Sequence, residues 1–132
     1  MTPKIILPYA ALLGLLLVYL SYKVVRYRVK FKIGVGDGGN AELVRAIRVQ
    51  GNFVEYVPLA LLLISLVELA GFSVWVVQVL GIVLLVGRII HAQGLGASAG
   101  PSRARVIGTA SSWLTIAVAA ILCLLAFGGV IF

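Results

Sequence analysis

Residues 106–132 read VIGTASSWLTIAVAAILCLLAFGGVIF, a stretch of the sequence that contains no charged side chain. An α-helix rises about 1.5 Å per residue, so about 20 apolar residues cross the roughly 30 Å hydrocarbon core of a membrane. The stretch therefore predicts a membrane-spanning helix at this end of the chain.

Three more apolar runs precede it, at residues 5–22, 53–70 and 72–90. Of the 132 residues, 62% are hydrophobic and 11% are charged, whereas soluble domains have roughly 45–50% apolar and about 25% charged residues. These proportions exclude an ordinary water-soluble enzyme, and four spans leave no room for a second soluble domain. Short loops make consecutive spans antiparallel. We therefore expect an all-α integral membrane protein, a single domain over residues 1–132 folded as a four-helix up-down bundle.

The positive charges gather in two of the three predicted loops, and the formal net charge is +7. The first loop and its flanks hold Lys23, Arg26, Arg28, Lys30, Lys32, Arg45 and Arg48, and the third holds Arg88, Arg103 and Arg105. Since an excess of Lys and Arg marks the cytoplasmic side, both termini are expected outside the cytoplasm and both long loops inside. The chain has no RNA-binding aromatic motif or basic soluble domain, so we expect no nucleic-acid partner.

A glycine-rich segment, residues 34–39, lies in the first loop. It lacks the preceding strand and the spacing of a phosphate-binding loop, so we interpret it as a turn. Helical periodicity resumes near Asn40 or Ala41 and continues into the second apolar run, so this helix is expected to begin outside the membrane.

Polar side chains share one face at the start of that helix. Arg45, Arg48, Asn52 and Glu55 are spaced three, four and three residues apart, which aligns them along one face. The four-helix topology brings five more polar residues to the same depth, namely Arg88, His91, Gln93, Arg103 and Arg105. Such a cluster suits a small zwitterionic or polyanionic ligand and would lower the pKa of a bound thiol. Alternatively, Glu55 pairs with Arg48 or with an arginine of another helix and only ties the bundle together.

Other chemistry-bearing residues give weaker signals. With one histidine, His91, and one remote cysteine, Cys123, the chain offers no metal-binding cluster. Glu68 lies beside the short turn between the second and third apolar runs, where we expect it to reach water and to have no function. Trp75 and Trp113 are interpreted as interface or packing residues.

Residues 48–58, which read R-V-Q-G-N-F-V-E-Y-V-P, resemble the second-helix signature of the MAPEG family, the membrane-associated proteins in eicosanoid and glutathione metabolism. The matching pattern is R-x-x-x-N-x-x-E-Y-x-P. The segment GRIIH at residues 87–91 is similar to the end of the third helix in the prostaglandin E synthase branch. The resemblance implies a homotrimer of four-helix subunits, with glutathione held as co-substrate between neighbouring subunits near the cytoplasmic face. The short chain and compact loops look like the bacterial branch, which implies a bacterial inner membrane.

The resemblance also implies roles for individual residues. Arg48 and Asn52 would hold the backbone and carboxylate of glutathione, and Glu55 would take its α-amino group. Arg105, or its neighbour Arg103, would stabilise the thiolate as the catalytic residue. The remaining candidates for glutathione binding are Gln50, Tyr56, Arg88, His91, Gln93 and, reaching across the subunit interface, Arg28 or its neighbour Arg26.

The function that follows is a glutathione-dependent transferase or peroxidase acting on lipophilic electrophiles or hydroperoxides that arrive from the bilayer. Leu95 and Gly108 stand at or near positions where the well-studied eukaryotic members have tyrosine, which argues against eicosanoid substrates. One alternative is a non-catalytic protein of the same fold that senses glutathione or serves in assembly. Another is a small multidrug transporter, but the run 5–22 lacks the intramembrane acid that proton-coupled export needs.

Overall fold

The structure, a computed structural model, describes residues 2–94 and 102–130. It contains four helices, α1 (Leu7–Phe31), α2 (Ala41–Leu69), α3 (Val74–Gln93) and α4 (Arg103–Phe127). The described residues contain no strand. All four helices are long and apolar enough to cross a membrane, which confirms the expected all-α membrane bundle.

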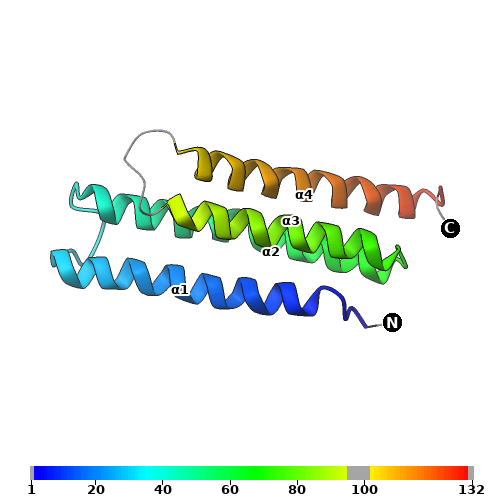
Figure 1. Ribbon diagram of the computed structural model, residues 1–132, viewed down its shortest axis with the longest axis horizontal. Helices are drawn as coiled ribbons and strands as arrows, with labels where there is room; N and C mark the ends of the chain where they lie inside the picture. Colours follow the sequence, from blue (N-terminus) through cyan, green and yellow to red (C-terminus); the bar gives the residue numbers. More distant parts are fainter. Residues whose placement is uncertain (1, 95–101, 131–132) are drawn as a thin grey trace.

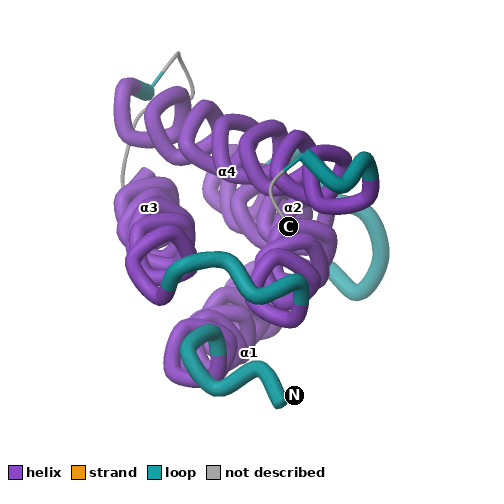
Figure 2. Tube along the Cα trace, turned by 90° about the vertical axis from the view of Figure 1, so that its right-hand side faces the viewer, coloured by secondary structure: helices purple, strands orange, loops and turns teal. Residues whose placement is uncertain are grey.

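The helices run up and down, with α2 and α3 in the middle. These two helices contact each other and both outer helices, α1 and α4, which lie on opposite sides of the bundle (Figure 2). The start of α1 and the end of α4 lie at one end of the molecule, and the α1–α2 connection, the end of α3 and the start of α4 lie at the other (Figure 1). We call the latter the basic end, because the Lys and Arg residues of the two predicted basic loops belong to it.

Two of the helices extend well beyond the apolar runs. α1 continues to Phe31 and carries its basic residues on helical turns. α2 begins at Ala41, where the Asn40 side chain accepts a hydrogen bond from the Leu43 amide at 2.9 Å and caps the helix. The expected helix start near Asn40 or Ala41 is therefore confirmed, and the face with Arg48, Asn52 and Glu55 belongs to one continuous helix.

Glycines let α3 approach its neighbours closely. A Cβ atom at Gly108 of α4 would lie 2.3 Å from the Cβ of His91 and 2.7 Å from the carbonyl oxygen of Gly87. At Gly81, a Cβ would lie 2.7 Å from the Tyr9 ring of α1. The short α3–α4 distance at the basic end places the polar residues of these two helices side by side.

The expectation that Glu68 reaches water is wrong. Its side chain is buried, 9% exposed, and its carboxylate accepts hydrogen bonds from three backbone amides, those of Lys4, Ile5 and Ile6, at 2.5, 2.7 and 3.0 Å. The end of α2 meets the segment before α1 here: Lys4 and Ile5 precede the helix and Ile6 is its N-cap, so α1 offers these three amides no hydrogen-bond partner. Glu68 supplies that partner.

Candidate functional site

A polar cavity of about 290 Å³ opens at the basic end between α2, α3 and α4. Its lining residues are Arg48, Val49, Asn52, His91, Arg105 and Thr109. Two of these residues are arginines and none is a carboxylate, so the lining is cationic. The structure thus brings together four of the predicted site residues, from three different helices.

Arg88 lies behind this cavity and orients one of its walls. The Arg88 side chain is 1% exposed, and its Nη1 donates hydrogen bonds to Asn52 Oδ1 at 2.9 Å and to Ser112 Oγ at 3.1 Å. Because a guanidinium can only donate, the oxygen of the Asn52 amide must face Arg88. The Nδ2 group is then the donor that Asn52 offers to the cavity.

The polar atoms around the cavity are incompletely satisfied within residues 2–94 and 102–130. Arg88 Nε and Nη2 are buried without a hydrogen-bond partner, as is Nδ1 of His91. Arg88 makes no ion pair with a carboxylate in this part of the chain, and its guanidinium lies 5.6 Å from the centroid of the Phe53 ring. Buried cations and polar groups without partners are costly in a fold, so each calls for a partner such as an ordered water or a ligand.

Glu55 pairs with Arg48, as the alternative interpretation of the sequence predicted, but both residues lie on α2, so the pair does not tie two helices together. The Arg48 Nη1 to Glu55 Oε1 distance is 3.8 Å, and the two side chains are 65% and 49% exposed. Both side chains are therefore largely exposed in the single chain; Arg48 also lines the polar cavity, and Glu55 does not. The next residue, Tyr56, packs edge-on against Trp113 of α4, with ring centroids 6.2 Å apart.

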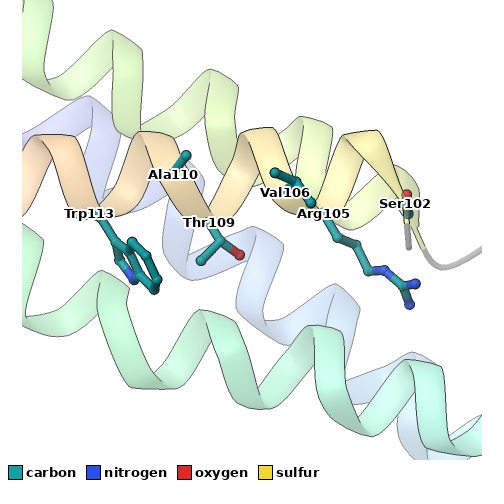
Figure 3. A pocket seen from close by; sticks show the side chains of 6 residues that line it. All are labelled: Ser102, Arg105, Val106, Thr109, Ala110 and Trp113. Atoms are coloured by element: carbon teal, nitrogen blue, oxygen red, sulfur yellow. The ribbon is translucent and has the colours of Figure 1, made fainter. Parts of the chain in front are cut away.

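An apolar groove of about 380 Å³ runs along α4, and Figure 3 shows the side chains that line it. It is lined by Ser102, Arg105, Val106, Thr109, Ala110 and Trp113. Arg105 and Thr109 line both spaces. Arg105 therefore stands where a polar compartment meets an apolar one, whereas Arg103 lines neither.

Several predicted site residues lie elsewhere. Arg28 donates from Nη1 to the carbonyl oxygens of Ile33, Gly34 and Gly36, at 3.4, 3.4 and 2.8 Å, and so holds the glycine-rich turn. Gln50 and Gln93 do not line the polar cavity formed by the described residues, and Leu95 lies outside those residues.

Two polar residues of the site were not predicted from the sequence. Thr109 follows Arg105 by four residues and Ser112 follows it by seven, spacings that repeat on one helical face. That periodicity in α4 was the signal that could have identified both residues.

Comparisons with known proteins agree with this architecture. The model of the MAPEG family matches residues 6–125. Two curated relatives, each called "Inner membrane protein YecN", come from Escherichia coli K12 and Escherichia coli O6:H1. Each is 48% identical over 86 residues, which cover 65% of this chain and 66% of the relative. The match thus spans just under two thirds of the length of these curated relatives.

Proposed function

This chain belongs to the MAPEG family, and on that premise we propose that it is a glutathione-dependent membrane enzyme. Its substrates would be lipophilic electrophiles or hydroperoxides, and its cellular location would be a bacterial inner membrane, with the basic end toward the cytoplasm.

The observation that carries the proposal is the position of Arg105 at the junction of the polar cavity and the apolar groove. Glutathione has two carboxylates, an ammonium group and a thiol. In the polar cavity, Arg48 and the Asn52 amide can bind a carboxylate. Glu55 does not line the cavity, but it pairs with Arg48 and can accept from an ammonium group beside it. The Arg105 guanidinium can then stabilise the thiolate where the apolar groove delivers the second substrate.

Conjugation needs only this thiolate and the lipophilic partner, whereas peroxide reduction also needs a second glutathione molecule. In conjugation, the thiol proton leaves to water, the sulfur forms a bond to the electrophilic carbon, and the leaving group departs with the bonding electron pair. In peroxide reduction, two glutathione molecules are oxidised to the disulfide while the hydroperoxide is reduced to an alcohol and water. In both cases Arg105 acts by holding the negative charge on sulfur.

The exposure of Glu55 and Arg48 supports an oligomer. The Glu55 carboxylate, about half exposed near the start of a membrane-spanning segment, would face the membrane in a single chain, where a charged group is disfavoured. We propose that a neighbouring copy covers this face and that the assembly is a homotrimer, as the resemblance implies. The contact across the interface predicted for Arg28, or for Arg26, would require this neighbour and stays a prediction.

The test is a titration of reduced glutathione into detergent-purified protein, followed by thiolate ultraviolet absorbance and by calorimetry. We expect a saturable thiolate signal at neutral pH, which Arg105→Ala abolishes while some binding heat persists. Glu55→Ala is expected to weaken binding itself. The matched control is Arg103→Ala, which removes the same charge two residues away, outside the cavity, and should retain the signal.

Three outcomes would contradict the proposal. No binding at millimolar glutathione would make the cavity structural or assign it to another ligand. Equal loss of the thiolate signal in Arg103→Ala and Arg105→Ala would indicate a general effect of positive charge. Binding without a thiolate signal would identify a non-catalytic protein that senses glutathione.

A further inference from the structure

A second polar cavity, of about 300 Å³, lies at the basic end between α1 and α2. Its lining residues are Lys23, Arg26, Tyr27, Lys30 and Glu42, and we call it the α1 cavity. It shares no lining residue with the polar cavity between α2, α3 and α4. Three cations and one carboxylate give its lining a net charge of +2 (3 − 1).

The cations form a row along one helical face. Lys23, Arg26 and Lys30 are spaced three and four residues apart on α1. Lys30 Nζ lies 3.7 Å from Glu42 Oε2, but neither Lys23 nor Arg26 pairs with a carboxylate within residues 2–94 and 102–130. The α1 cavity thus has cationic charge that no described acidic group neutralises.

The same face of α1 continues as an exposed apolar stripe. Leu12, Leu15 and Tyr19 precede Lys23 by whole turns and are 50%, 69% and 48% exposed. Lys23 Nζ lies 5.7 Å from the Tyr19 ring centroid, so the apolar stripe and the cationic row meet there. From Leu12 to Lys23 the helix rises about 16 Å, close to half of a roughly 30 Å hydrocarbon core.

We propose that the α1 cavity binds the phosphodiester headgroup of an anionic phospholipid, whose acyl chains lie along Leu12, Leu15 and Tyr19. Basic pockets between transmembrane helices on the cytoplasmic side are suited to anionic headgroups. A free phosphate would satisfy the cations but leave the adjoining stripe without a role. A zwitterionic headgroup would bring its own cation and lose the advantage of the net positive charge.

The experiment is a titration of detergent-solubilised protein with phosphatidylglycerol or with phosphatidylcholine of the same acyl chains, with bound lipid measured by native mass spectrometry. We expect preferential retention of phosphatidylglycerol. The double variant Lys23→Gln/Lys30→Gln should weaken it roughly 10- to 30-fold, since each basic residue near an anionic surface contributes a factor of about five.

Two further variants distinguish specific binding in the α1 cavity from a general effect of positive charge. Lys32→Gln/Arg103→Gln removes the same number of charges from the same end, outside the α1 cavity, and should bind phosphatidylglycerol like the unmodified protein. Glu42→Gln raises the net charge of the lining from +2 to +3 (2 + 1) and should tighten binding about fivefold. Tighter binding of phosphatidylglycerol by Glu42→Gln would also show that this variant remains folded.

The proposal is overturned if both double variants lose phosphatidylglycerol equally, or if Glu42→Gln has no effect. Displacement of the lipid by millimolar inorganic phosphate would identify a site for free phosphate instead. Displacement by reduced glutathione would assign the α1 cavity to glutathione. Apart from that last outcome, which would move the glutathione site, failure of the lipid site leaves the proposed enzyme function untouched, because glutathione binding is measured in a separate titration.

Discussion

The guanidinium of Arg88 on α3 donates to the amide oxygen of Asn52 on α2 over 2.9 Å, and the same Nη1 atom donates to Ser112 on α4. One buried side chain thereby fixes the relative depth of three helices. Ser112 in turn donates to the carbonyl oxygen of Gly108 at 3.1 Å. The wall of the polar cavity is therefore set by the packing of the bundle before any ligand enters.

Replacing Asn52 by aspartate separates the two roles of its amide. The Asn52→Asp variant keeps an oxygen for Arg88 and adds an ion pair with it, but presents an anionic oxygen where the amide presents a donor. We expect glutathione binding to weaken at least about tenfold, with no decrease in the thermal unfolding midpoint. Calorimetry and circular dichroism measure the two effects. If Asn52→Asp bound glutathione normally, the amide would not contact the ligand.

Arg88→Met should reduce glutathione binding with little or no loss of stability. The substitution removes a buried charge that has no carboxylate partner in the described chain and fills the space of its aliphatic stem. We expect the free energy of unfolding to rise, or to fall by less than about 1 kcal/mol, while glutathione binding weakens about tenfold because Asn52 loses its orientation. Arg88→Lys is the control that retains the charge. A large loss of stability in Arg88→Met alone would show that the guanidinium stabilises the fold.

Much of the fold and part of the site could be predicted from the sequence because they depend on periodicity. Uninterrupted apolar runs identify membrane spans whatever other helices pack against them. Arg48 and Asn52 are four residues apart, and Arg88 and His91 are three apart, so each pair must share a helical face. Antiparallel topology then brings the two faces to the same end.

The rest depends on contacts between segments distant in sequence. The hydrogen bonds of Arg28 require the turn after α1, in which Gly36 has a φ of +70°. The burial of Glu68 requires the start of α1 to fold over the end of α2. The sequence favoured Arg105 over Arg103 only by its place at the start of the fourth apolar run, whereas in the structure Arg105 lines both cavities and Arg103 lines neither.

Gly108→Ala should destabilise the bundle and disturb the site together. The new methyl group would lie 2.3 Å from the Cβ of His91 and 2.7 Å from the Gly87 carbonyl oxygen, so α3 and α4 must separate. We expect a loss of about 1–3 kcal/mol in stability and weaker glutathione binding, because His91 lines the polar cavity. Gly14→Ala is the matched control on α1, where nothing lies within 4 Å of the added Cβ. Equal thermal midpoints for the two variants would show that the α3–α4 contact tolerates expansion.

Glu68→Gln should release the start of α1. Oε1 of Glu68 accepts from the amides of Lys4 and Ile5, and Oε2 accepts from Ile6. A glutamine retains one acceptor oxygen, while its amino group would face an amide N–H, donor against donor. The side chain also loses the negative charge that the positive N-terminal end of the α1 dipole favours.

Together these changes should cost about 1–3 kcal/mol and speed hydrogen exchange at the amides of residues 4–6, with little change at the basic end. The control is Glu42→Gln, which removes a carboxylate that is 46% exposed and 3.7 Å from Lys30. Such a surface pair contributes at most about 1 kcal/mol, so exchange at residues 4–6 should stay slow in the control. Unchanged exchange in Glu68→Gln would mean that apolar packing of α1, and not the carboxylate, holds this segment in place.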